Sequence, residues 1–232
     1  MLELKSVSHY YHQVRALHEI HLTFLPGQVH GIVGTNGAGK TTLLMLISQL
    51  LKIQQGTIEL NRKAISSTEV AFLPAHTYLY HYITGQEYLA LFQAHNPSAN
   101  FEVLNRIFRL PLHRLVDEYS TGMRKKLALM GLIALNRPVF VLDEPFNSVD
   151  MEGVFAFQEA IKWLAKQGKI ILITSHIFES LASVCDYIHY LQEGVICGSY
   201  DQSHFDHLHQ ALRHQFEQSH QPDWQEFFGF KQ

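Results

Sequence analysis

The sequence predicts an α/β fold in which a parallel β-sheet core carries an N-terminal antiparallel β subdomain and a helical insertion subdomain. Two uninterrupted apolar runs, Val139–Leu142 and Ile170–Ile173, are typical of strands buried on both faces of a parallel sheet. Between them, Phe155–Lys166 is amphipathic and ends just before Gly168, a residue that suits a helix C-terminus. Strand, helix and strand in this order predict a βαβ unit.

The first 75 residues are expected to form strands around one helix. Leu2–Leu4 alternates, and Leu22–Leu25 runs into the turn signal Pro26-Gly27, as in a small antiparallel sheet. The apolar segment Gln28–Val33 then leads into a glycine-rich loop. We expect a helix at Thr41–Leu51 and two further strands at Thr57–Leu60 and Val70–Leu73.

From about residue 76 to 135 the periodicity changes from strands to helices. Apolar residues recur at helical spacing after Thr84 and from Phe101 to Phe108, and a further helix is expected at 123–134. We therefore assign residues 1–200 to one α/β domain with a helical insertion at about 76–135.

Residues 201–232 are rich in Gln and His and are expected to form a C-terminal helical tail. One helix face carries Phe205, Leu208, Leu212 and Phe216, and Trp224, Phe227, Phe228 and Phe230 follow. This apolar face either packs on its own domain or docks a partner.

Composition excludes several classes of protein. With 232 residues and 47% hydrophobic side chains, the chain can form one sizeable core and is not mostly disordered. A net charge of −3 gives no basic footprint, so no nucleic acid partner is expected. Two cysteines indicate reduced thiols in a cytosolic protein. The 16 histidines show no paired metal spacing, and we read them as solvated surface side chains.

The sequence also shows neither a membrane-spanning segment nor a secretion signal. No apolar stretch reaches the roughly 18–20 residues that a membrane-spanning helix needs. The N-terminal residues lack the basic-then-apolar layout of a signal peptide. We therefore expect that another chain holds this protein at a membrane if it works there.

The strongest chemical signal is a P-loop between the strand at 28–33 and the following helix. The pattern G-x-x-x-x-G-K-T predicts that successive backbone N–H groups and a helix N-terminus face the phosphates of a nucleotide. Lys40 adds a positive charge for those phosphates, and the Thr41 hydroxyl can bind Mg²⁺. The loop residues are Gly34, Thr35, Asn36, Gly37, Ala38, Gly39, Lys40, Thr41 and Thr42. A P-loop NTPase core is therefore predicted.

A second signal is a pair of acids at the end of the strand at 139–142. Because ligands of α/β proteins bind at the carboxyl ends of the strands, Asp143 and Glu144 are expected beside the P-loop. Asp143 suits the Mg²⁺ shell, and Glu144 suits a general base that polarises the attacking water.

With these motifs the chain resembles, over roughly residues 1–200, the nucleotide-binding subunit of ATP-binding cassette (ABC) transporters. Tyr119-Ser-Thr-Gly-Met123 is similar to that family's signature motif, L-S-G-G-Q, and matches it at Ser120 and Gly122. The Tyr-Ser-x-Gly-Met form is also found in cassettes of drug or lipid exporters. Independently of the resemblance, Ser120 is a good helix N-cap and Gly122 exposes the backbone, so a second anion-binding helix terminus is predicted here.

The resemblance implies further site residues. Tyr11 precedes Gly34 by the interval at which the family has an aromatic residue that stacks on adenine. Tyr10 is the alternative candidate for this role, one position earlier. Asp150 closes the segment that matches the family's D-loop, and His176 matches its switch histidine near the γ-phosphate. The family usually has Gln where this chain has Ala75, followed by His76, so a slower or differently coupled ATPase is expected.

The resemblance also implies an assembly. Two ATPase subunits, identical or paralogous, would form a head-to-tail dimer in which each ATP, with Mg²⁺, lies between the P-loop of one and the signature motif of the other. The dimer would drive a separate transmembrane permease from the cytoplasmic face of the membrane, with export favoured. The alternative is a soluble ABC-type ATPase that is not linked to transport. Tyr78, Tyr80, Tyr82, Tyr88 and Phe92 either receive the permease or form the core of the insertion.

Overall fold

The computed structural model describes residues 1–214 and 217, and within them a mixed six-stranded sheet forms the centre of the fold. Its order is β10-β9-β3-β8-β7-β6. The strands β3, β6, β7, β8 and β9 run parallel, and β10 is antiparallel to β9. Their bounds are Val29–Val33 (β3), Val70–Leu73 (β6), Val139–Asp143 (β7), Ile170–Thr174 (β8), Tyr187–Gln192 (β9) and Val195–Asp201 (β10).

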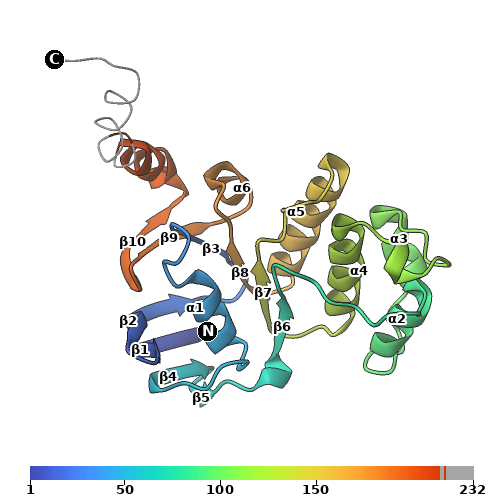
Figure 1. The fold of residues 1–232 in the computed structure, drawn as a ribbon, viewed down its shortest axis with the longest axis horizontal. Helices are drawn as coiled ribbons and strands as arrows, with labels where there is room; N and C mark the ends of the chain where they lie inside the picture. Colours follow the sequence, from blue (N-terminus) through green and yellow to red (C-terminus); the bar gives the residue numbers. More distant parts are fainter. Residues whose placement is uncertain (215–216, 218–232) are drawn as a thin grey trace.

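A smaller antiparallel sheet of order β2-β1-β4-β5 lies on the opposite side of helix α1 (Lys40–Ile47) from the central strands (Figure 1). Its strands are β1 (Leu2–Tyr11), β2 (Val14–Phe24), β4 (Gln55–Leu60) and β5 (Lys63–Ala64). Leucines of α1 share one core with Leu2 and Leu4 of β1 and with Val139 and Val141 of β7. Burial between two sheets explains why α1 is apolar nearly all round.

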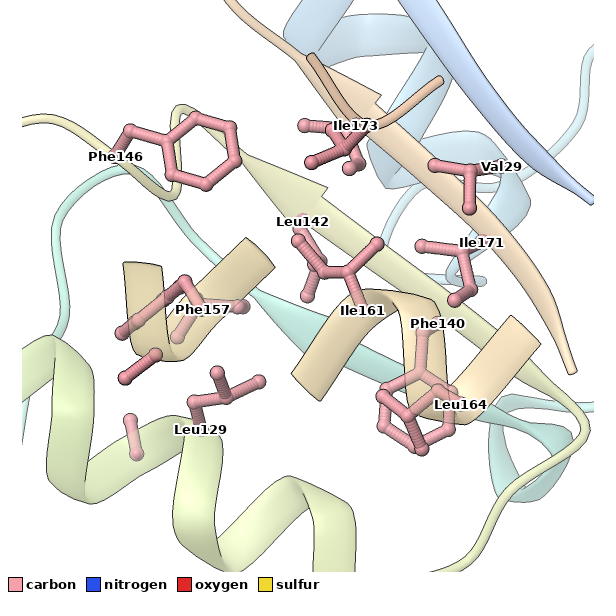
Figure 2. Close-up of a cluster of buried hydrophobic side chains, with 14 of the residues drawn as sticks. Val29, Leu129, Phe140, Leu142, Phe146, Phe157, Ile161, Leu164, Ile171 and Ile173 are labelled. Atoms are coloured by element: carbon pink, nitrogen blue, oxygen red, sulfur yellow. The ribbon is translucent and has the colours of Figure 1, made fainter. Parts of the chain in front are cut away.

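The opposite face of the central sheet is covered by helices. Phe140 and Leu142 alternate with the residues that face α1, and they pack against Phe157 and Ile161 of α5 (Met151–Lys166) and against Leu129 (Figure 2). Every residue of β7 and β8 is buried, and both strands are apolar up to their last residues, Asp143 and Thr174.

Helices α2 (Gly85–Gln93), α3 (Phe101–Phe108) and α4 (Thr121–Ala134) lie together at one side of the molecule, away from the N-terminal sheet (Figure 1). Each begins at a side-chain cap. Thr84 forms a capping box with Glu87, Asn100 accepts from the N–H of Val103, and Ser120 accepts from the N–H of Met123. A short helix, α6 (Phe178–Ala182), follows β8.

The βαβ unit is confirmed, because β7 and β8 are parallel neighbours connected by α5. Element ends differ from the sequence predictions. Helix α1 ends at Ile47 rather than residue 51, since Gln49 adopts a left-handed backbone conformation. Helix α5 begins at Met151, four residues before the expected start, because Asp150 caps it there. Helix α4 likewise begins at residue 121, behind the cap at Ser120.

The expectation that the histidines are surface side chains is wrong for three of them. His9, His30 and His189 are buried. Nδ1 of His30 lies 3.1 Å from Nε2 of His189, and the rings are stacked. Burial lowers the pKa of His30 to about 3 and that of His189 to about 4, so both are neutral and act as polar core side chains.

Residues 205–214 are helical, and their apolar face packs on the protein's own domain. Phe205 and Leu208 are buried, and the ring of His209 stacks on that of Phe178 in α6. The other aromatic residues predicted for the tail lie outside the described residues: Phe216, Trp224, Phe227, Phe228 and Phe230. The domain boundaries near 76, 135 and 200 stay predictions.

Candidate functional site

The loop 34–39 connects the end of β3 to the N-terminus of α1, in the strand–loop–helix context that the sequence predicts. Gly39, the N-cap residue, has a φ of 106° in the left-handed region, and it offers the helix no side-chain cap. A side chain at this position would also meet the carbonyl oxygen of Ala16 on β2. The N-terminus of α1 therefore keeps the open, uncapped backbone that an anion needs.

Lys40, the first residue of α1, bends back over the loop. Its Nζ donates to the carbonyl oxygens of Gly34 at 2.7 Å and of Thr35 at 3.0 Å. Burial lowers the pKa of Lys40, while the charges of Glu144 and Asp143 oppose that shift. The lysine is thus held at the loop by two neutral carbonyl acceptors. A phosphate can take their place and accept stronger, charge-assisted hydrogen bonds from the lysine.

The two residues predicted to bind Mg²⁺ lie together. The Thr41 hydroxyl donates to Oδ2 of Asp143 at 3.0 Å, although 102 residues separate them in the chain. The other carboxylate oxygen, Oδ1, accepts from the Thr174 hydroxyl at 2.6 Å. Asp143 is buried at the end of β7, so its carboxylate is fixed in place by hydrogen bonds from α1 and β8.

Glu144 and His176 also meet. Nδ1 of His176, just beyond β8, lies 3.0 Å from Oε2 of Glu144, which accepts a second hydrogen bond from the Asn147 amide at 3.2 Å. The main chain of Glu144 is left-handed, with a φ of 49°. Such a conformation is uncommon for a residue other than glycine and is typical of functional sites held by their surroundings.

The signature-like segment forms the N-terminus of α4. Ser120 is exposed and caps the helix, with its hydroxyl 3.2 Å from the N–H of Met123. Gly122 is buried against the segment after Glu144, where an added Cβ would collide with the carbonyl oxygen of Ser148. Tyr119, the departure from the usual Leu, is buried and donates its hydroxyl to the Pro111 carbonyl at 2.8 Å.

Asp150 stands next to this segment and caps α5. Its Oδ1 accepts from the N–H of Gly153 at 3.2 Å and forms an ion pair with Nζ of Lys126 at 2.5 Å. The hydrogen bond from Lys126 holds the pKa of Asp150 below its usual value. The structure therefore links the segment 147–150 to helix α4 by a charged contact.

Tyr11 lies at the end of β1, opposite Val14 in the hairpin, and its ring is 45% exposed. It contacts His9 edge-on at 4.9 Å between ring centroids. Among the hydrogen bonds and ring contacts of the described residues, none joins Tyr11 to the loop. The neighbouring Tyr10 is held by its backbone, which exchanges two hydrogen bonds with the side chain of Gln54.

Sequence reasoning missed two residues that contact the acidic pair. Thr174 donates to Asp143 and accepts from the N–H of Glu144 at 3.0 Å. Lys125 is buried within α4, and its Nζ donates to the carbonyl oxygen of Glu144 at 2.5 Å. Parallel pairing of β7 with β8 sets Thr174 opposite Asp143, so the strand alignment carried a signal for Thr174. For Lys125, the signal in the sequence was its position beside the apolar residues of a predicted helix, which suggests a buried lysine.

Where the family usually has Gln, Ala75 follows β6 at the same edge of the sheet and is half-buried, while His76 is exposed. Ala75 offers no side-chain oxygen to the site. The predicted P-loop, acidic pair and histidine otherwise converge where β3, β7 and β8 end. The α/β fold, with these residues at the carboxyl ends of its parallel strands, defines the chain as a P-loop NTPase.

Comparison with known proteins gives the family. A family model described as ABC transporter matches residues 17–147. The ATP-binding protein NatA of Bacillus subtilis is 32% identical over 79% of this chain and 80% of its own length. YtrB of the same organism is 28% identical over 87% and 72%. The chain belongs to the ABC transporter family as an ATP-binding subunit, and it is an ATPase.

Solved structures agree with the fold. An ATP-binding subunit of an ABC transporter superposes with a TM-score of 0.81 at 26% identity, over 93% of each chain. The dimeric bacterial cassette MJ0796 gives a TM-score of 0.78 at 20% identity, over 87% of this chain and 99% of its own. Within the part of the chain that the structure describes, every helix is too short or too polar to cross a bilayer.

Proposed function

We propose that this chain is the ATP-hydrolysing subunit of a transporter whose membrane permease is a separate chain, with export as the direction of transport. The carrying observation is the hydrogen bond between Glu144 and His176 beside the Thr41–Asp143 pair. A base, two metal-binding oxygens and a phosphate-binding helix terminus at one sheet edge are the parts that hydrolysis of a nucleoside triphosphate requires.

In the proposed complex the amides of residues 34–42 and Nζ of Lys40 hold the phosphates of ATP. The hydroxyl of Thr41 and the carboxylate of Asp143 fit Mg²⁺, because both are oxygen donors and they already lie 3.0 Å apart. When bound, Mg²⁺ would neutralise charge that develops on the phosphate oxygens. The exposed ring of Tyr11 would stack on the adenine.

Hydrolysis then uses Glu144 as the base. Its carboxylate accepts a proton from water as the water oxygen bonds to the γ-phosphorus. The bond between that phosphorus and the oxygen bridging to the β-phosphate breaks, leaving ADP and inorganic phosphate. His176, fixed by its hydrogen bond to Glu144, orients the water and the γ-phosphate.

The site is completed in trans by a second ATPase subunit. Ser120 is exposed at the N-terminus of α4, where the helix terminus can receive the phosphates held by the other chain. Gly122 keeps that terminus close to the segment of Asp150. The dimeric cassette MJ0796 is a precedent for such pairing.

The permease is proposed to dock on the helical region from the cytoplasmic face of the membrane. Tyr78, Tyr80 and Tyr82 are 91%, 69% and 87% exposed, so they contribute little to the core. Tyr88 and Phe92, in contrast, pack within the helices. Large exposed aromatics are enriched at protein interfaces. The Tyr-Ser-x-Gly-Met form of the signature supports export.

One experiment tests the catalytic proposal. E144Q removes the base while keeping the shape of the side chain, so the variant should bind Mg-ATP, lose nearly all turnover and accumulate as an ATP-bound dimer in light scattering. Full activity in E144Q would contradict the role of Glu144. A second experiment tests the link to transport. Co-purification of the chain with a multi-span membrane protein in detergent would support a transporter subunit, and repeated isolation without such a protein would support an ATPase not linked to transport.

A further inference from the structure

The backbone of Glu144 is held on both sides. Its N–H donates to the Thr174 hydroxyl at 3.0 Å, and its carbonyl oxygen accepts from Nζ of Lys125 at 2.5 Å and from the N–H of Asn147 at 3.3 Å. A left-handed φ of 49° is unfavourable for glutamate and persists where surrounding contacts fix it. The contacts from β8 and α4 supply that restraint.

Lys125 is an unusual choice for its position. Its side chain is 1% exposed, and its hydrogen-bond acceptor is a carbonyl rather than a carboxylate. Burial lowers the pKa of Lys125, while the charges of Glu144 and Asp143 favour its charged form. A buried cation without a directly bonded acid is costly, and methionine would fill the same space without that cost. Stability of the core therefore does not account for a lysine here.

The position of Lys125 on α4 joins two parts of the proposed reaction. Lys125 lies five residues after Ser120, on the helix whose N-terminus is proposed to meet the ATP of the second subunit. The next residue, Lys126, forms the ion pair with Asp150. A rigid helix that touches the partner's ATP at its start thus contacts the backbone of its own catalytic acid about one turn later.

We propose that Lys125 is a positioning residue for hydrolysis, which rests on the proposed role of Glu144 as the base. It fixes the left-handed main chain of Glu144 so that the carboxylate meets His176, and it ties this geometry to the helix that begins at Ser120. Displacement of the carboxylate by about 1 Å lowers catalysis on the order of 10²-fold. Nucleotide binding at residues 34–42 does not depend on Lys125.

The test compares K125M with the wild type in the full chain. The expected result is a fall in kcat on the order of 10²-fold with an unchanged Kd for Mg-ATP, measured by binding of a fluorescent ATP analogue. K125Q retains an N–H donor for the carbonyl and should recover part of the lost kcat. K162M is the matched control, because Lys162 on α5 pairs with Glu159 at the surface; its kcat should equal that of the wild type.

Two outcomes overturn the proposal. An unchanged kcat in K125M does so, as does a loss of kcat accompanied by an equal loss of ATP affinity. If K125M fails to fold by circular dichroism, K125L, which also lacks a donor for the Glu144 carbonyl, is measured instead, and wild-type kcat in K125L contradicts the positioning role. E144Q is measured in parallel: full activity there refutes the proposed function, whereas an inactive E144Q with a fully active K125M refutes the role of Lys125 alone.

Discussion

Nδ1 of His176 lies 3.0 Å from Oε2 of Glu144, so the side chain that follows β8 meets the acid that follows β7. The two residues are 32 positions apart in the chain and come together because β7 and β8 are adjacent parallel strands. Parallel strands end at the same edge of a sheet, which brings separate loops to one site.

Replacing His176 with Ala should lower kcat on the order of 10²-fold, because the water and the γ-phosphate lose a group that orients them. Binding of Mg-ATP should persist, since Lys40 and the loop amides are untouched. Steady-state hydrolysis and nucleotide titration measure the two effects. H95A, a change at an exposed histidine, serves as the control, and a wild-type kcat in H176A would remove His176 from the mechanism.

Thr41→Val should weaken the effect of Mg²⁺ on ATP binding by about 10-fold, because valine keeps the shape of threonine but cannot bind the ion. ATP affinity is measured with Mg²⁺ and again in EDTA. The affinity in EDTA should match the wild type. Thr57→Val on β4 is the control. Equal stimulation by Mg²⁺ in the wild type and in T41V would argue against this ligand.

Tyr119→Phe should lower the free energy of unfolding by about 1 kcal/mol. The variant leaves the half-buried Pro111 carbonyl without the hydroxyl that donates to it. Urea denaturation checks this, with Tyr78→Phe as the matched control, because Tyr78 is 91% exposed. If both variants unfold at the same urea concentration as the wild type, the hydrogen bond contributes nothing.

The buried histidines predict acid sensitivity. Well above pH 6.5, His30 and His189 are neutral in both the folded and unfolded states and add no pH dependence. Below pH 6.5, both histidines become protonated in the unfolded chain but stay neutral in the folded chain, because their folded pKa values are about 3 and about 4. At pH 5 each histidine should cost about 2 kcal/mol of stability. H30F should reduce the difference in unfolding free energy between pH 7.5 and pH 5, whereas H113F at an exposed site should not.

Ala75→Gln should raise kcat, because the glutamine that the family usually has at this place would supply a side-chain oxygen at the end of β6. Hydrolysis rates of the variant and the wild type are compared at saturating Mg-ATP. A rate equal to that of the wild type would mean that the position is silent in this chain.

Sequence reasoning located the loop, the acidic pair and the histidine because each follows an apolar strand that a local pattern reveals. Thr174 was missed because its role depends on the register between β7 and β8. Lys125 was missed because a lysine in a helix is ordinarily exposed, and only the packing of α4 buries it. The buried histidine pair likewise depends on two strands that lie 159 residues apart in sequence. Local patterns thus predicted the elements, and contacts between distant segments remained hidden.

The central claim is that each ATP lies between two copies of the chain. The test mixes two variants. Lys40→Ala removes the lysine that binds the phosphates, and Ser120→Arg blocks the helix terminus that meets the ATP of the other subunit. Each variant alone should be inactive, and the mixture should hydrolyse ATP, because a mixed dimer contains one site with both an intact Lys40 and an intact Ser120. A mixture as inactive as its components, although subunits carrying different affinity tags co-purify as mixed dimers, would contradict the account.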